Sequence, residues 1–152
     1  MTFSSGAVDG PDGVAVVCRD NASVTVRLCE RSSEDGWCVH YSVEVRGPGL
    51  GARIEDVVGW VGDSQGLGGF LEALAGDFAG WEGERLWTTG DRDLAVSAVH
   101  RSGGHVGLTW TLRPWRSTAA GWSASVTTWL EAGAQMSSLA SDIRHFVDGP
   151  AD

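Results

Sequence analysis

The sequence predicts an α+β fold in which about seven or eight strands form one mainly antiparallel, twisted sheet and two amphipathic helices cover one of its faces. Apolar and polar residues alternate with a period of two over most of the chain. Two stretches repeat instead with the period of a helix, and Gly or Pro residues separate the segments. A chain of 152 residues is long enough to bury a core of its own.

The first half of the chain carries the first group of predicted strands. They are expected over residues 14–18, 23–28, 37–46 and 50–58. Gly47-Pro48-Gly49 breaks the chain before the last of them. Matching the apolar faces of the central hairpin places Leu28 opposite Val39, and this register puts Cys29 opposite Cys38 on the other face.

The second half repeats this pattern. Strands are expected over residues 84–88, 94–99, 106–113 and 122–130. Matching apolar faces places Ala98 opposite Val106 and leaves a three-residue loop over 101–103. Residues 24–31 align with 94–101, and residues 39–46 align with 106–113, which is consistent with a duplicated unit of strands followed by a helix. Similar local architecture without common origin explains the same pattern.

A helix is expected at the end of each half. The apolar stripe of the first helix consists of Leu67, Phe70, Leu71, Leu74 and Phe78. That of the second consists of Met136, Leu139, Ile143 and Phe146. Asp63 or Ser64 can cap the start of the first helix, and Gly80 can end it. We therefore expect a single domain over 14–148, with flexible tails at 1–13 and 149–152.

The net charge of the chain limits the classes of partner that it can bind. Eleven Arg and twenty Asp plus Glu, with no Lys, give a net charge of −9, which repels nucleic acids and anionic membranes. The sequence contains no apolar run long enough to cross a bilayer. The three cysteines, Cys18, Cys29 and Cys38, form no CxxC pair, so we expect reduced thiols and a cytoplasmic protein. We expect neither nucleic acid nor membrane as a partner, and the oligomeric state stays open.

Among the eight tryptophans, the alternation assigns Trp37, Trp110 and Trp122 to the core. Trp115 lies between two Arg residues in a breaker loop, and Trp129 is out of phase with the apolar face of its strand. An exposed Trp beside Arg is typical of binding hot spots, although packing of the ring against an Arg stem accounts for the same pattern.

The polar face of the predicted sheet is the candidate binding surface, because hydroxyl groups, one carboxylate, Arg and Trp together suit recognition by hydrogen bonds. An ordinary solvated sheet face has the same composition. The candidate residues are His40, Ser42, Glu44, Arg46, Thr109, Thr111, Arg113, Trp115, Ser123, Ser125, Thr127 and Trp129.

No catalytic residue is assigned, since no GxSxG, HExxH or phosphate-loop motif stands in its required context. We expect no bound metal, because His100 and His105 flank a turn but point to opposite faces of the sheet. We also expect no cofactor. His40 lies two residues from Cys38 on the same face, so a thiol–imidazole pair is geometrically conceivable. Gly66-Leu67-Gly68-Gly69 is interpreted as a flexible entry to the helix, although its N–H groups could also face an anion.

Residues 52–139 carry several longer motifs. They are Arg53-Ile54-Glu55-Asp56-Val57-Val58, Phe70-Leu71-Glu72, Ser102-Gly103-Gly104-His105-Val106, Leu108-Thr109-Trp110-Thr111-Leu112-Arg113-Pro114-Trp115 and Gly121-Trp122-Ser123-Ala124-Ser125-Val126. On these motifs the chain resembles an uncharacterised family, a domain of unknown function common in actinomycete genomes. The resemblance implies a soluble bacterial cytoplasmic domain, and it carries over no catalytic or binding residue.

Two classes of function follow from the sequence. The favoured class is a binding or protein-interaction module without catalysis, similar to toxin-neutralising immunity proteins by analogy of architecture only. The alternative is a small-molecule site or enzyme between sheet and helices that uses His40, Glu44 and Arg46 or Arg113. A cavity there of about 300 Å³ or more with convergent polar groups favours the alternative, and a solid core favours the interaction module.

Overall fold

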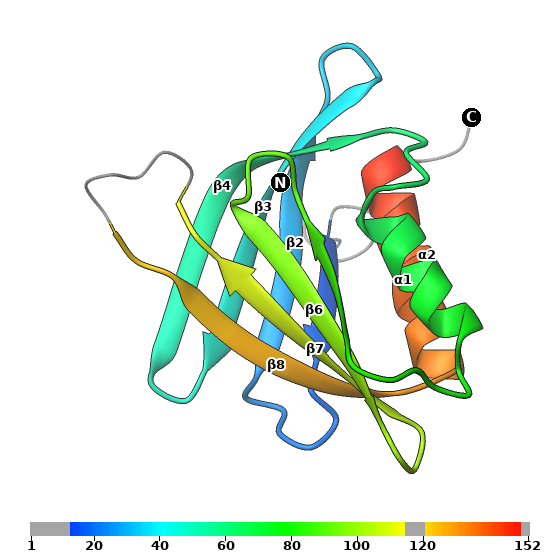
Figure 1. Ribbon diagram of the computed structural model, residues 1–152. Helices are drawn as coiled ribbons and strands as arrows, with labels where there is room; N and C mark the ends of the chain where they lie inside the picture. Colours follow the sequence, from blue (N-terminus) through cyan, green and yellow to red (C-terminus); the bar gives the residue numbers. More distant parts are fainter. Residues whose placement is uncertain (1–12, 115–120, 150–152) are drawn as a thin grey trace, which may run out of the picture.

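The computed structural model in Figure 1 describes residues 13–114 and 121–149. The first half contains β1 (Gly13–Val17), β2 (Thr25–Ser32), β3 (Cys38–Gly47), β4 (Leu50–Trp60) and α1 (Leu67–Gly76). The second contains β5 (Glu84–Thr88), β6 (Leu94–Arg101), β7 (His105–Leu112), β8 (Ala124–Glu131) and α2 (Ala134–Asp148). The α+β class with antiparallel pairing is confirmed. Both halves have the order of four strands and a helix, and a common origin of the halves stays a prediction.

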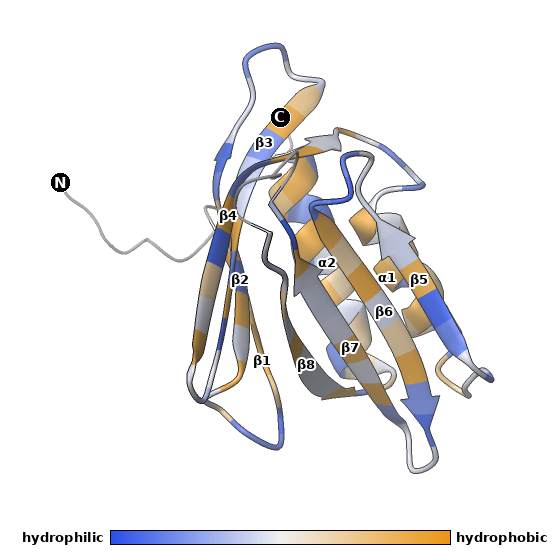
Figure 2. Ribbon diagram, turned by 60° about the vertical axis from the view of Figure 1, so that its left-hand side comes forward, coloured by the Kyte–Doolittle hydropathy of each residue, from blue (hydrophilic) through white to orange (hydrophobic). Residues whose placement is uncertain are grey.

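The strands form two sheets, so the prediction of a single sheet is wrong. The first sheet has the order β1-β2-β3-β4 and the second the order β5-β6-β7-β8 (Figure 2). After β4 the chain turns into α1, and the following strand starts the second sheet instead of pairing with β4. Period-two alternation identifies a strand and its buried face, but it does not determine which sheet the strand joins.

α2 packs against α1 and against both sheets, so the helices do not simply cover one face of one sheet. α1 and α2 are antiparallel neighbours (Figure 1), and α2 contacts β1, β4 and β8. The Arg144 guanidinium of α2 donates to both carboxylate oxygens of Glu72 on α1, at 2.8 and 2.6 Å. α2 therefore bridges the two sheets, and the ion pair fixes α1 beside it.

The turn after β1 also links the sheets. The backbone N–H of Arg19 donates to the carbonyl of Trp129 on β8 at 3.0 Å. The Arg19 guanidinium forms an ion pair with Glu131 at 3.3 Å. These contacts close the β8 side of the molecule by joining the two sheets directly.

The hairpin registers differ from the predicted ones by an even number of residues. Leu28 pairs with Val43 instead of Val39, so Cys29 lies opposite Ser42 and not opposite Cys38. In the second sheet, Ala98 pairs with Leu108 instead of Val106. An even shift keeps every side chain on its predicted face, so the buried faces are right although the pairs are wrong.

Trp110 on β7 lies at the centre of the core and is fully buried. Its indole Nε1–H donates to the hydroxyl of Thr128 on β8 at 2.9 Å, which satisfies both buried polar groups. The assignment of Trp110 to the core is confirmed. Those of Trp37 and Trp122 are wrong: both have the phase of a buried face, but they lie beyond the ends of their strands and are exposed.

The ends of α1 also differ from expectation. The helix starts after Gly66, and no side chain caps it, because the Asp63 carboxylate accepts the Gln65 N–H in the turn before it. The helix stops at Gly76 with Asp77 as its C-cap, before the expected end at Gly80. Phe78 consequently falls outside the helix and is exposed instead of extending the apolar stripe.

We expect Trp110→Ala to lower the free energy of unfolding by about 3–5 kcal/mol, because it removes a fully buried aromatic ring and leaves a cavity. Chemical denaturation measures this change. Trp37→Ala is the matched control, since Trp37 is exposed and its loss leaves no cavity. Equal denaturation midpoints for the two variants would remove Trp110 from the core.

Candidate functional site

The predicted polar face is divided between the two sheets. His40, Ser42, Glu44 and Arg46 lie on β3 of the first sheet. Thr109, Thr111, Ser125, Thr127 and Trp129 lie on β7 and β8 of the second, with Arg113 and Ser123 beside those strands. Trp115 lies outside the described residues. The candidate residues therefore do not form one continuous surface.

The hydroxyl groups of the second sheet bond to each other across the strands. Thr109 Oγ1 and Thr127 Oγ1 are 2.8 Å apart, and Thr111 Oγ1 and Ser125 Oγ are 2.9 Å apart. Both are directly opposed pairs of the β7–β8 ladder. Because these hydroxyls already have partners, this part of the face is a stabilising polar ladder of the sheet.

Trp129 is packed against the sheet. Its ring covers Gly107 on β7, where an added Cβ would lie 2.7 Å from a ring atom. The guanidinium of Arg101 stacks over the Trp129 ring, 4.5 Å from its centroid. The ring therefore contacts both a glycine backbone and an Arg cation of its own sheet, as the Arg-packing alternative expects.

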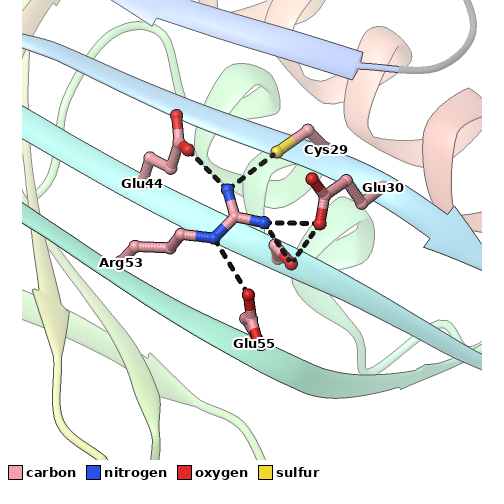
Figure 3. Close-up of polar contacts among 6 residues, drawn as sticks. Cys29, Glu30, Glu44, Arg53 and Glu55 are labelled. Carbon is pink, nitrogen blue, oxygen red and sulfur yellow. Dashed lines mark hydrogen bonds and ion pairs between the residues drawn. The ribbon is translucent and has the colours of Figure 1, made fainter.

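The outer face of the first sheet carries a charged cluster around Arg53 of β4, shown in Figure 3. Its guanidinium donates to Glu44 at 2.5 Å, to Glu55 at 3.3 Å and to Glu30. Ser42 accepts a bond from Arg53 at 3.3 Å and donates to Glu30 at 3.2 Å. One cation thus holds three carboxylates from three strands, which we call the Arg53 cluster.

The Arg53 cluster contains two of the predicted residues, Ser42 and Glu44, and its central cation was not among them. Alternation puts Arg53 and Glu55 on one outer face of their strand, but only the strand pairing shows that this face adjoins Glu44. The hydrogen bond to Glu44 raises the pKa of Arg53 further above its ordinary value. Burial, followed by the charge of Glu44, raises the pKa of the neighbouring Cys29 thiol, which favours its protonated form.

Cys38 and His40 on β3 and Asp56 on β4 lie one after another on the same sheet. Cys38 Sγ is 3.7 Å from His40 Nε2, and His40 Nδ1 is 4.0 Å from Asp56 Oδ1. The conceivable thiol–imidazole contact is therefore present. The 4.0 Å between His40 and Asp56 exceeds the roughly 2.6–3.2 Å of a hydrogen bond, so the Asp56 carboxylate does not orient the imidazole in this structure.

The turn between β2 and β3 projects beyond the rest of the molecule (Figure 1) and ends with the exposed Trp37. The Asp35 carboxylate accepts the N–H groups of Trp37 and Cys38 at 2.8 and 2.9 Å. The Ser33 hydroxyl donates to the Cys38 carbonyl at 2.8 Å and accepts the Gly36 N–H at 3.1 Å. These four bonds fix the tip, and backbone donors lower the pKa of Asp35.

A cavity of about 180 Å³ lies where the end of β4, the start of α1, the turn after β5 and the end of α2 meet. Tyr41 and Thr89 line it beside the backbone of Gly66, Leu67 and Gly68. The complete set of lining residues also includes Val58, Gly59, Trp60, Asp63, Gln65, Trp87, Thr88, Gly90, Arg144, Val147 and Asp148. We call it the α1 cavity. It is a space between sheets and helices, of the kind that the second class of function requires.

His40, Glu44, Arg46 and Arg113 do not line the α1 cavity. The first three lie on the outer side of β3, and Arg113 follows β7 with its side chain exposed. The expectation that they serve a site between sheet and helices is therefore wrong. Alternation places them on polar faces, and these faces point away from the helices.

Asp93 and Thr89 lie beside Tyr41, next to the α1 cavity. The Thr89 hydroxyl donates to Asp93 Oδ1 at 2.6 Å. Burial raises the pKa of Asp93, and it also raises the pKa of Tyr41, to which the Asp93 charge contributes. Tyr41 therefore remains a neutral phenol.

Within residues 13–114 and 121–149, no three His, Cys, Asp or Glu side chains are arranged to hold a metal ion. The described helices include none that is long and apolar enough to span a membrane.

These features define an α+β protein built from two four-stranded antiparallel sheets and two helices, with ion pairs on one outer face and a small cavity between sheets and helices. The chain belongs to a family of unknown function (DUF6228), whose model matches residues 17–150. The resemblance to a domain of unknown function is thereby confirmed. No curated protein and no solved structure matches the chain.

We expect Arg53→Ala to lower the free energy of unfolding by about 1–3 kcal/mol, because it removes charge-assisted bonds and leaves three carboxylates without their cation. Urea denaturation measures the change. Arg46→Ala is the matched control, since Arg46 is on β3 of the same sheet and forms no ion pair with a described residue. Equal effects of the two substitutions would contradict a stabilising role of the Arg53 cluster.

We expect Asp93→Asn to raise the melting temperature at pH 7. The native protein binds the Asp93 proton more tightly than the unfolded chain, so stability is lost as the pH rises through the raised pKa. Asparagine keeps an oxygen for the Thr89 hydroxyl and removes this charge. The difference should disappear near about pH 3, where the carboxyl of the original protein is protonated in both states. A lower melting temperature at pH 7 would contradict this.

Proposed function

We propose that the protein is a non-catalytic protein-binding module of the cytoplasm and that the β2–β3 turn presents Trp37 to its partner. One observation carries the proposal: Trp37 is 70% exposed on a tip that four hydrogen bonds hold in place. Cytoplasmic placement is supported by three free cysteines, two of them buried, which need no oxidising compartment.

The fixed tip favours binding because it reduces the entropy lost on association. A tryptophan ring contributes a large contact area, and Trp is enriched among the residues that dominate interface energies. Asp35 holds the backbone of the ring-bearing residue, so the partner need not order it.

The charge around the tip indicates the chemistry of the partner. Glu34 and Asp35 are exposed beside Trp37, and the whole chain carries a net charge of −9. A partner with an apolar pocket for the indole and Arg or Lys residues around that pocket complements this surface.

A second candidate function, binding of a small molecule, is favoured by the α1 cavity. Its volume of about 180 Å³ is smaller than the roughly 300–1,000 Å³ of typical ligand sites, which favours the interaction module as the first proposal. The polar groups that converge on it nevertheless suit a ligand of a few atoms.

The test is affinity capture from a lysate of the source organism with the tagged original protein, Trp37→Ala and Leu86→Ala. Leu86 is the matched control because it is also a large exposed apolar residue, at 63%, but lies on the other sheet. We expect a protein partner that Leu86→Ala retains and Trp37→Ala loses, with weaker capture at high salt. Equal capture by all three, or no specific protein with the original chain, contradicts the proposal.

A further inference from the structure

The first turn of α1 presents hydrogen-bond donors to the α1 cavity. Within the described part of the chain, the N–H groups of Leu67 and Gly68 have no acceptor, since no side chain caps the helix. Both residues are buried, and both line the cavity. Unpaired N–H groups at the positive end of a helix dipole favour an anionic group.

Tyr41 provides an independent indication of a ligand. Only 3% of its surface is exposed, and it lines the same cavity. Its hydroxyl has no hydrogen-bond partner among residues 13–114 and 121–149, although tyrosines in cores normally have one, and it is not fully enclosed, since the enclosed unpaired side-chain atom of those residues is His100 Nε2. Its ring is fixed against Phe146 in an edge-on contact, with 5.6 Å between centroids. A fixed, buried phenol without a partner is suited to bind a polar atom inside the cavity.

The same cavity is also lined by two carboxylates, which are negatively charged hydrogen-bond acceptors. Asp63 and Asp148 both line it, and each uses Oδ1 to accept a backbone N–H, from Gln65 and Gly62 respectively, at 2.9 Å. Their Oδ2 atoms accept no hydrogen bond from the described residues. The charge of Arg144 is already balanced by Glu72. The cavity therefore combines backbone donors with two carboxylates whose second oxygens are available.

We propose that the α1 cavity binds a small zwitterion, a short α-amino acid or a molecule of the same chemistry. Its carboxylate accepts from the N–H groups of Leu67 and Gly68 and from the Tyr41 hydroxyl, and its ammonium group donates to Asp63 and Asp148. This inference rests on the second candidate function and not on the Trp37 contact.

Size and charge both select this class of ligand. A volume of about 180 Å³ equals that of about six water molecules, which limits the ligand to a few non-hydrogen atoms. A simple anion would meet the two carboxylates, and a simple cation would meet the N-terminus of the helix. A molecule that carries both charges avoids either repulsion.

The experiment is a titration of the ¹⁵N-labelled full chain at pH 7, followed through the backbone amide signals of Leu67 and Gly68. Glycine, L-alanine and L-serine are the zwitterionic probes, with acetate and methylammonium as single-charge probes. We expect at least one zwitterion to shift both signals and to bind at least about tenfold more tightly than either single-charge probe, a difference of about 1.4 kcal/mol. Equal or tighter binding of acetate or methylammonium overturns the proposal, as does the absence of shifts with all three zwitterions.

Three variants test the assignment of the groups. Asp63→Asn and Asp148→Asn keep the oxygen that accepts the backbone N–H and remove the charge, so each should weaken zwitterion binding about tenfold without weakening acetate binding. Tyr41→Phe removes only the hydroxyl and should weaken zwitterions and acetate alike. Undiminished zwitterion binding by both Asp variants overturns the proposed ammonium contact.

Trp37→Ala separates this inference from the proposed protein contact. This variant should bind the zwitterion like the original chain, since Trp37 does not line the cavity. In turn, Asp148→Asn should capture the protein partner normally. Loss of partner capture alone therefore affects the interaction module, and loss of ligand binding alone affects the cavity.

Discussion

The apolar inner faces of two four-stranded sheets share one hydrophobic core, and this shared burial is the constraint on which the structure depends. A four-stranded sheet with one apolar face must cover that face, and here the other sheet and two helices cover it. Trp110 lies within this core, and its bond to Thr128 fixes two strands of the second sheet. Because α2 contacts strands of both sheets, loss of its packing would expose both inner faces.

The two outer faces satisfy their polar groups in different ways. The second sheet uses neutral hydroxyl pairs such as Thr109–Thr127, which need no charge and leave few bonding groups for a partner. The first sheet gathers three carboxylates around Arg53, so its charge is partly neutralised within the sheet. Polarity of a sheet face is thus a poor guide to binding. Trp37 and the α1 cavity differ from these two faces. The ring of Trp37 is exposed, and the donors that line the α1 cavity have no partner within the described chain.

The sequence determines much of this fold, since the period-two pattern identified the strands, their buried faces and Trp110 correctly. It could not assign strands to sheets, because a side chain alternates in the same way in one sheet as in two. Trp37 was misplaced since phase alone does not show where the core ends along a strand. Arg53 and the α1 cavity depend on contacts between segments distant in sequence. The segment Gly66-Leu67-Gly68-Gly69 by itself predicts a flexible entry to the helix, because Tyr41 and Asp148, which line the same cavity, come from other elements.

The N-termini of the two helices both have N–H groups without a side-chain cap, but they differ in how exposed those groups are. Both begin after a glycine, Gly66 or Gly133, and neither has a side-chain cap. At α2 the first residues, Ala134 and Gln135, are exposed, so water can bond to their N–H groups. At α1 the first two residues, Leu67 and Gly68, are buried and line a cavity together with Tyr41, whose hydroxyl has no partner among the described residues. The exposed start of α2 therefore needs no ligand to satisfy its backbone N–H groups. The buried start of α1 is satisfied best by a molecule that supplies oxygen acceptors there.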